Sequence, residues 1–594
     1  MVAIVDGVRT HWPALVGATA LALLVASPLY LVPRAMGEAY QGINIMEFGN
    51  DEHLYLSRGK EALEGKNLGQ PFLAEGKDAS DPTRSFPEKI LVAPVRALGL
   101  ESSIDIVTYF NVLNTAGVFV LVLAMYALGL RLSGNKWLAL GCALFAIGGY
   151  TIIEAKTLFY EGFNIYGRSL YPYASSVPFF IFLNVLYDAV IRKRGWPYTV
   201  GAGLLLGLLC YIYFYAWTFA FALLGALGII FIVLRDWNGL WAAISVGALG
   251  LSIGAYNISQ MFAVILGQFG TQISYFYFSV KAHTPVMSKI GTATLVLLLF
   301  ALWRGVRDRS LIFIAALVAA GWISLNQQIV TGRMLQYGHY YWYFIVPLAV
   351  IIGPALLARV FPERLMRYLA FALIAVAFLN LAGQQYRSVP KILETKIHEQ
   401  SYAPILTVLN REPSGVVLAS TWSGKALSTL VTIYTSHDLY WFPSAEVHIF
   451  PIERLREALM VHLFLNHESR ADPIHYLKEK LAQHTTSLDE YVNMYGELEG
   501  FYSGFDYRAY QDAVRAGEES FGGLREKLLA EIAADYEARF HSPAYVEELL
   551  KVRGVRYVLS DATLNPGWDL SVFPDLSEII RNDSVVLYEF FKQE

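Results

Sequence analysis

The first 384 residues of this chain hold many long apolar stretches, and the last 210 hold none of comparable length. A bilayer core about 30 Å thick is crossed by a helix of ~20 apolar residues, which satisfies its backbone hydrogen bonds internally. The pattern therefore predicts an α-helical polytopic membrane domain with about eleven spans. They are expected at residues 13–32, 106–130, 137–153, 171–191, 198–214, 216–234, 239–258, 289–303, 310–326, 339–358 and 367–383.

Charge divides the chain at the same place. Residues 1–384 hold 26 Lys and Arg against 19 Asp and Glu, whereas residues 385–594 hold 20 against 31. The acidic part is long enough to bury a core of its own. It mixes a helix-like pattern at 402–411 with a strand-like run at 416–420. We therefore predict a transmembrane domain over 1–384 and a soluble extracytoplasmic α/β domain over 385–594.

The orientation is predicted from the basic residues of the short loops. Arg131, Lys136 and later Lys and Arg clusters lie in alternate loops, which the positive-inside rule assigns to the cytoplasm. The N-terminus is then cytoplasmic and the C-terminal domain lies outside. A twelfth span at 261–280 would break this pattern, so that segment is expected to be an interfacial or re-entrant helix. No targeting signal is recognised, and the chain has only two cysteines. Both observations favour a bacterial inner membrane.

Composition and motifs narrow the function. A net charge of −4 argues against a nucleic-acid partner, because nucleic-acid-binding domains are usually basic. Residues 385–594 contain no Gly-rich phosphate loop, no nucleophile elbow and no paired Cys/His spacing. Polar and ionisable residues at membrane depth are costly and tend to be functional. The candidate chemistry is therefore expected in the outer loops of the membrane domain.

The first outer loop, residues 33–105, contains the strongest local signal. Asp51 and Glu52 are adjacent carboxylates, and His53 adds a candidate metal ligand or proton partner. A carboxylate in a partly desolvated cleft can act as a general base near neutral pH. Asp51 is equally a good N-cap for a helix starting near Leu54. The residues alone leave both interpretations open.

Later outer segments supply further polar groups. Residues 153–171 include Glu154, Glu161 and Arg168 among aromatic residues. Residues 326–338 and the following His339 form a second polar turn.

Cations on the outer side are candidate phosphate ligands. Arg333 can bind a phosphate with its fork of donors, and Lys281 can neutralise a lipid phosphate. Gln336 and His339 lie one helical turn apart, so both can face one cleft. The alternative for each cation is an anchor to lipid headgroups.

A carboxylate pair in a long first outer loop, many spans and a C-terminal outer domain together resemble the GT-C superfamily of integral-membrane glycosyltransferases. The protein O-mannosyltransferases and the lipid A aminoarabinose transferases are the most similar branches. The resemblance implies that Asp51 is the catalytic base and Glu52 its partner. It implies Glu161, or as second choice Glu154, as the second acid. The Trp-Trp-Asp motif of oligosaccharyltransferases is absent from residues 385–594, which argues against that branch.

The resemblance implies an inverting transfer of a sugar from a polyprenyl-phosphate carrier to an extracytoplasmic acceptor. The donor phosphate is expected at Arg333, Arg168 and Lys281. The acceptor or sugar is expected at His339, Gln336, Glu154 and His53. The sequence indicates no particular cofactor. It leaves open whether a divalent metal binds at Asp51, Glu52 and His53.

Two other functions remain open from the sequence. One is a transporter or flippase of lipid-linked glycans, and the other is a non-enzymatic assembly protein in contact with membrane lipid. Clustering of Asp51, Glu161, Arg333 and His339 around one outer cavity favours the transferase, and their dispersal favours the assembly protein.

Overall fold

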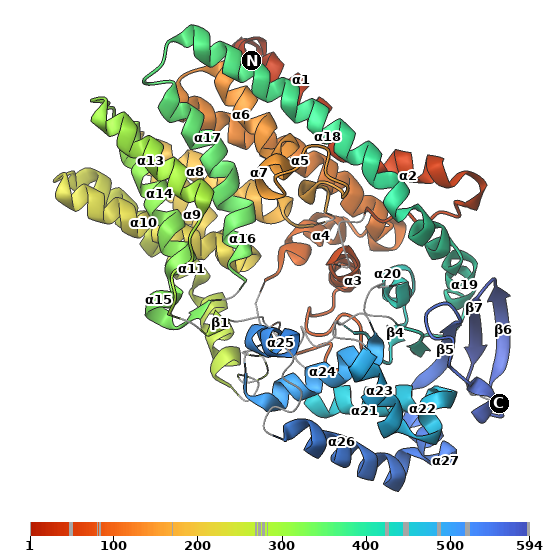
Figure 1. The fold of residues 1–594 in the computed structure, drawn as a ribbon. Coiled ribbons are helices and arrows are strands. Elements are labelled where there is room, and N and C mark those ends of the chain that lie inside the picture. Colours follow the sequence, from red (N-terminus) through yellow and green to blue (C-terminus); the bar gives the residue numbers. More distant parts are fainter. Residues whose placement is uncertain are drawn as a thin grey trace.

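The structure, a computed structural model, has a helical part and a sheet-containing part (Figure 1). It describes residues 2–46, 51–79, 81, 85–168, 170–267, 270, 272, 275, 280–281, 283–334, 336–421, 427–443, 451–483, 489–505, 507–516 and 523–590. Helix α18 (Glu363–Gln400) begins among the apolar helices and runs to the C-terminal part. The expected domain boundary after residue 384 falls inside this helix and stays a prediction.

Every predicted span coincides with a helix, and the last of them is α18. Within the described residues, eight helical stretches are long and apolar enough to cross a membrane, while α6, α9 and α13 are shorter apolar helices. The prediction of a polytopic helical membrane protein is confirmed. The other helices are α1 (Val2–Val25) with α2 (Pro28–Met36), α5 (Ile106–Ser133), α6 (Lys136–Gly148), α8 (Tyr173–Val190), α9 (Trp196–Ile212), α10 (Phe214–Val233), α11 (Trp237–Leu266), α13 (Lys289–Trp303), α14 (Ser310–Asn326), and α16 (Gly338–Tyr340) continuing into α17 (Val346–Leu357).

Small residues let α6 and α18 approach closely. A Cβ on Gly141 would lie 2.8 Å from the carbonyl oxygen of Ala370, and one on Gly148 would lie 2.5 Å from that of Ala377. In a lipid environment the hydrophobic effect does not drive apolar helices together, so van der Waals contacts between closely packed backbones stabilise their association instead. We infer that α18 is held firmly where it leaves the membrane helices.

The long loop 33–105, predicted to lie on the outer side, carries two helices of its own. Helix α3 (Asp51–Leu63) already includes the carboxylate pair, ahead of the start expected near Leu54, and α4 (Pro87–Ala97) follows it. Figure 1 places both between the apolar helices and α20 (Leu430–Tyr434) of the C-terminal part. The expected interfacial segment 261–280 begins as the end of helix α11 (Trp237–Leu266), and nine of its later residues lie outside the described part of the chain.

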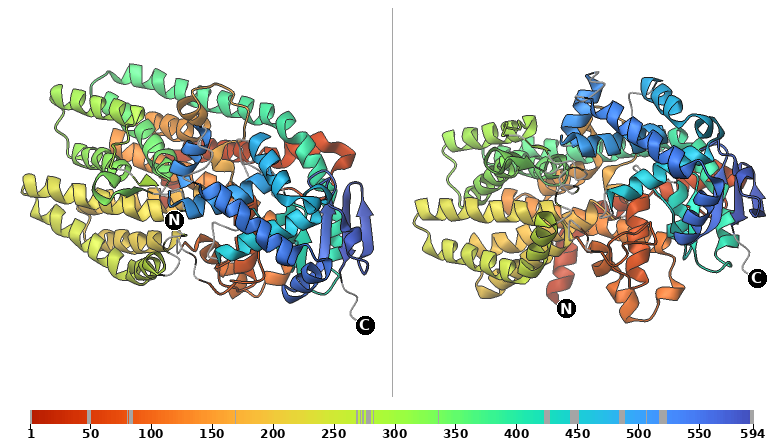
Figure 2. Two further views of the ribbon diagram at one scale, coloured as in Figure 1. Left: turned by 60° about the horizontal axis from the view of Figure 1, so that its bottom comes forward. Right: turned by 90° about the horizontal axis from the view of Figure 1, so that it is seen from below.

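The C-terminal part contains a five-stranded sheet in the order β4-β3-β5-β7-β6. Strand β3 runs parallel to β4 and β5, whereas β7 is antiparallel to β5 and β6. Figure 2 shows the sheet at one end of the molecule. The expected α/β domain type is confirmed. The strands are β3 (Val416–Ala419), β4 (Asp438–Leu439), β5 (Val555–Asp561), β6 (Ser577–Asn582) and β7 (Val585–Glu589).

Along the chain, helices lie before the first strand of this sheet and between its later strands. The described residues between β4 and β5 are mostly helical, and the last of these helices, α27, leads directly into β5. The helices are α19 (Tyr402–Leu409), α21 (Ile452–Leu465), α22 (His467–Ala471), α23 (Pro473–Gln483), α24 (Glu490–Ser503), α25 (Tyr507–Arg515), α26 (Leu524–Asp535) and α27 (Pro543–Val552).

Asp561 joins the end of α18 to the sheet. Its buried carboxylate accepts hydrogen bonds of 2.7 Å each from His398 Nε2 and Tyr402 OH, and a further 2.7 Å bond from the Thr563 hydroxyl. Burial alone raises the pKa of Asp561, but these hydrogen bonds outweigh it and bring the pKa to about 2. In the folded protein this carboxylate is therefore charged at neutral pH.

Replacing Asp561 by asparagine is expected to destabilise the protein by ~2 kcal/mol at neutral pH. A carboxyl whose folded pKa lies below its unfolded value stabilises the fold above the unfolded pKa. That stability is lost as the pH falls toward the folded pKa. Thermal unfolding in detergent from pH 7 down to about pH 3 should show a steeper decline for the wild type than for Asp561→Asn. Parallel curves would contradict the role of this carboxylate.

Candidate active site

Arg168 brings the two carboxylates of α3 together. Its Nε donates to Glu52 Oε1 at 3.1 Å, and its Nη2 donates to Asp51 Oδ2. Arg168 and Glu52 are buried, whereas 58% of the Asp51 side chain is exposed. One buried guanidinium thus faces two carboxylates, of which only Asp51 is accessible to solvent.

Local structure explains why Arg168 can reach α3. The chain before it forms a short 3-10 turn, Ile165–Gly167, which the side chain of Asn164 caps by accepting from Tyr166 N at 3.0 Å. Asn164 also donates to Ile147 O of α6 at 3.0 Å. The second outer loop is therefore fixed to the end of a membrane helix, and Arg168 extends from a rigid support.

Two tyrosines complete the surroundings of Arg168. Its Nη1 donates to Tyr343 OH at 3.2 Å, and its guanidinium lies 5.4 Å from the ring centre of Tyr55. Burial alone lowers the pKa of Arg168, yet Tyr55, Tyr343 and the two carboxylates raise it well above its ordinary value. Arg168 is therefore a permanent cation at this site.

His339 and Gln336 lie on the other side of Tyr343. The ring of His339 meets that of Tyr343 edge-on, with centres 5.6 Å apart. Gln336 Oε1 lies 2.5 Å from His339 Nε2, and Tyr213 OH contacts His339 Nδ1. Because Oε1 can only accept, Nε2 carries the proton and Nδ1 accepts from Tyr213. Gln336 and His339 thus meet, as their one-turn spacing predicts.

Tyrosine rings form a continuous wall beside these polar groups. Ring centres lie 4.8 Å apart for Tyr55 and Tyr171, 5.2 Å for Tyr171 and Tyr213, and 5.3 Å for Tyr213 and Tyr215. Tyr215 also stacks on His339 at 4.7 Å. The aromatic run at 211–217 is equally typical of an interfacial belt. Its sequence pattern alone therefore does not separate contact with the lipid interface from contact with a sugar.

Arg58 is a buried cation that the sequence argument missed. It donates to Asp81 Oδ2 at 2.6 Å, to Glu88 Oε1 at 2.7 Å and to Ser85 O at 2.8 Å. Its position one turn after Tyr55 on the same helical face is the signal that would have indicated it. These bonds tie α3 to α4 and to the loop between them.

The other predicted residues have separate partners. Glu154 accepts from Trp342 Nε1 at 3.0 Å, one residue from Tyr343. Glu161 pairs with Arg387 at 3.0 Å and Lys391 at 3.2 Å on α18. His53 is buried, and its Nδ1 lies 2.9 Å from the hydroxyl of Thr429.

Arg333 and Lys281 lie on a two-stranded antiparallel sheet formed by segments far apart in the sequence. Strand β1 (Val280–Lys281) pairs antiparallel with β2 (Arg333–Met334), and Lys281 lies directly opposite Arg333. The Arg333 side chain is exposed. Of the four residues expected to cluster in a transferase, Asp51 and His339 are linked through Arg168 and Tyr343. Glu161 instead pairs with α18, and Arg333 O accepts a hydrogen bond from Gln327.

The described residues show no group of three His, Cys, Asp or Glu side chains placed to hold a metal ion. Asp51 and Glu52 turn toward Arg168, whereas His53 turns toward Thr429. The three neighbours in sequence therefore do not converge on one point.

An open, mainly apolar pocket lies among the membrane helices. Its walls come from α10, α13, α14 and α17, and include Phe219, Leu317 and Leu348. Ser288 and Trp322 add polar atoms to its lining. Its shape and chemistry suit a hydrocarbon chain better than a polar solute.

Comparison with known proteins gives a distant structural likeness. No family model and no curated protein sequence matches the chain. The archaeal oligosaccharyltransferase AglB from Archaeoglobus fulgidus, in complex with an inhibitory peptide and a dolichol-phosphate, is 12% identical with a TM-score of 0.44. That match covers 98% of this chain and 75% of the other.

Two further structures of the Archaeoglobus fulgidus oligosaccharyltransferase match similarly. The apo form is 12% identical with a TM-score of 0.46, over 93% of this chain and 69% of the other. The form tethered with an acceptor peptide containing the NVT sequon is 12% identical with a TM-score of 0.42, over 99% and 75%. With TM-scores below 0.5, these similarities assign neither an activity nor site residues to this chain.

Proposed function

We propose that the protein is a membrane glycosyltransferase that moves a sugar from a polyprenyl-phosphate carrier to an acceptor outside the cytoplasm. The observation that carries the proposal is the cluster at Arg168, where a buried guanidinium holds Glu52 and the exposed Asp51 beside a wall of tyrosines. A fixed, accessible carboxylate next to aromatic faces suits deprotonation of a hydroxyl on a sugar-sized ligand.

In the proposed reaction, Asp51 accepts the proton of the acceptor hydroxyl. Its Oδ2 is held by Arg168, and its Oδ1 accepts no hydrogen bond from the residues that the structure describes. The acceptor oxygen forms a bond to the anomeric carbon as the bond from that carbon to the phosphate oxygen breaks. The electron pair leaves with the lipid phosphate, and this single displacement inverts the anomeric centre.

We assign the donor phosphate to Arg333 and Lys281. Their backbones are paired, so two cations can approach one dianionic or monoanionic group. Arg168, whose donors already serve Asp51, Glu52 and Tyr343, acts as a positioning residue in this proposal. The polyprenyl chain would occupy the apolar cavity beside Phe219 and Leu317.

His339, Gln336 and Glu154 are proposed to orient the sugar or the acceptor. They lie around Tyr343 through direct contacts or through its neighbour Trp342. Glu161 and His53 have partners elsewhere and take no step in this mechanism.

The test uses purified full-length protein in proteoliposomes with polyprenyl phosphates carrying radiolabelled mannose, glucose or aminoarabinose. We expect at least one donor to be consumed, with release of free polyprenyl phosphate and label of inverted anomeric configuration in a membrane acceptor or in water. Mass spectrometry of co-purified lipid then identifies the native carrier. Donor binding with flipping across the bilayer and no bond cleavage would instead establish a transporter.

A further inference from the structure

Helix α3 presents two opposite faces to two different parts of the molecule. Asp51, Glu52 and Tyr55 contact Arg168 on one face. His53 and Ser57, one helical turn apart, lie on another face and contact the C-terminal domain. The carboxylate helix is therefore enclosed between the membrane helices and a domain that follows it by more than three hundred residues.

Two buried hydroxyl contacts hold the second face. His53 Nδ1 lies 2.9 Å from Thr429 Oγ1, and Ser57 Oγ lies 2.8 Å from Thr432 Oγ1. Thr432 donates its own proton to Thr429 O at 2.9 Å, so Ser57 must be the donor in its pair. All four side chains are buried, and the hydrogen bonds are therefore shielded from competing water.

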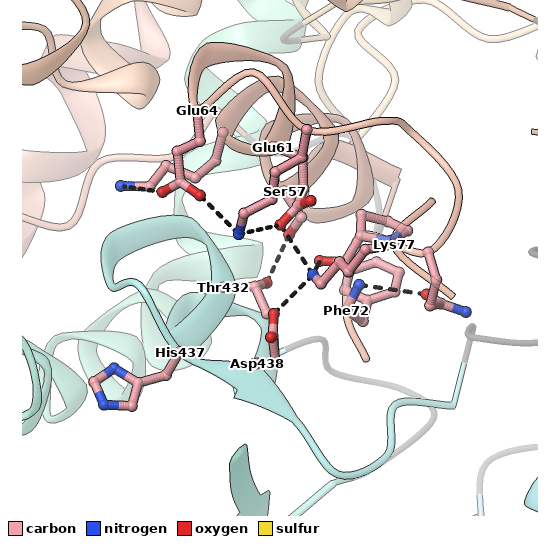
Figure 3. Close-up of polar contacts among 12 residues, drawn as sticks. Ser57, Glu61, Glu64, Phe72, Lys77, Thr432, His437 and Asp438 are labelled. Atoms are coloured by element: carbon pink, nitrogen blue, oxygen red, sulfur yellow. Dashed lines mark hydrogen bonds and ion pairs between the residues drawn. The ribbon is translucent and has the colours of Figure 1, made fainter. Parts of the chain in front are cut away.

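Ion pairs continue this contact along α3 (Figure 3). Lys77 Nζ bridges Glu61 Oε1 at 2.9 Å and Asp438 Oδ1 at 2.7 Å. Lys66 adds a pair with Glu61 at 3.3 Å. The buried carboxylate of Glu61 thus links its own loop to strand β4 of the C-terminal sheet.

The backbone of the same loop extends the sheet. Leu73 forms a parallel bridge with Leu439, and Leu439 N donates to Phe72 O at 2.7 Å. The β4 edge is thereby covered by the outer loop that carries α3, which fixes the register of that loop against the domain.

We infer that the C-terminal domain sets the position of the Asp51 carboxylate by holding the opposite face of α3, with Thr429 and Thr432 as positioning residues. This rests on the proposed transferase function. An isolated helix of 13 residues is marginal in water, so α3 takes its position from its neighbours. A misplacement of a reacting group by about 1 Å can cost ~100-fold in rate.

The test is the double variant Thr429→Val/Thr432→Val, which keeps the side-chain shape and removes both hydroxyls. We expect kcat for polyprenyl-phosphate mannose, or whichever labelled donor the wild type consumes, to fall ~10- to 100-fold with KM for the donor unchanged. Hydrogen exchange of residues 51–63 should accelerate. Replacing both by serine should restore the rate and the protection.

Thr435→Val is the matched control. Thr435 is also buried and lies just after α20, but its hydroxyl donates to Val431 O at 2.6 Å and accepts from His437 N at 3.2 Å, both within the C-terminal part. We expect wild-type exchange in α3 and wild-type kcat.

The outcomes separate this inference from the proposed function. Valine variants that match the Thr435→Val control in exchange or in kcat would overturn the inference. A wild type that consumes none of the labelled donors would overturn the proposed function. The exchange of α3 would then decide by itself whether the C-terminal domain holds the helix.

Discussion

Replacing Asp51 by asparagine is expected to lower the rate of sugar transfer by ~100- to 10,000-fold. The amide has the same shape and can still accept from Arg168, so the geometry is kept and proton acceptance is lost. Because 58% of the Asp51 side chain is exposed, the unfolding temperature should stay close to that of the wild type. Initial rates in proteoliposomes and thermal unfolding in detergent measure the two effects.

Asp78→Asn is the matched control for this prediction. Asp78 is an exposed carboxylate of the same outer loop, and it accepts a hydrogen bond from Asn67 at 3.3 Å rather than from the Arg168 cluster. It undergoes the same chemical change and should transfer sugar at the wild-type rate. Transfer by Asp51→Asn at the wild-type rate would remove Asp51 from the role of base. Asp51 would then keep only a structural role, through its ion pair with Arg168.

Replacing Arg168 by methionine is expected to destabilise the fold by ~3–5 kcal/mol and to abolish transfer. Glu52 is fully buried, and without Arg168 its charge would lack its cationic partner. Asp51 would at the same time lose the donor that fixes its Oδ2. The stability and the transfer rate of Arg168→Lys should fall between those of the wild type and of Arg168→Met. Lysine keeps the positive charge, but one ammonium cannot reproduce the divergent donors of the guanidinium.

The double variant Glu52→Met/Arg168→Met separates stability from catalysis. Replacing both members of a buried ion pair by apolar groups of similar size is often neutral for stability. We therefore expect the unfolding temperature to recover while transfer stays low. Recovery of transfer in the double variant would show that Arg168 serves only the fold. An unchanged unfolding temperature in Arg168→Met would contradict the buried pair.

The membrane helices follow from local sequence. Each apolar run satisfies its own backbone hydrogen bonds as a helix, so hydropathy predicts its place with little reference to the rest of the chain. The strand at 416–419 and the helix-turn-strand before Asp561 are similarly local patterns. Asp51 lies inside α3, and therefore not at a cap before a helix starting near Leu54, which was one of the two interpretations that the sequence left open.

The partners within the candidate site do not follow from local sequence. Arg168 lies 117 residues from Asp51 and 175 from Tyr343, and no spacing rule connects them. Outer-side cations such as Arg168 and Arg333 look alike in sequence. Arg168 is buried against carboxylates, whereas Arg333 is exposed on a two-stranded sheet. Burial and pairing are properties of the packed structure.

The sequence by itself determined that this chain crosses a membrane, that an acidic α/β part follows, and that Asp51 and Glu52 stand out in the first outer loop. Hydropathy and adjacent charges are local quantities, and they act within a few residues of the chain. Only the tertiary structure decided that Arg168 holds both carboxylates and that the C-terminal domain contacts the opposite face of α3. Those contacts depend on how distant segments pack, because a buried charge or hydroxyl is stable only where the fold supplies its partner.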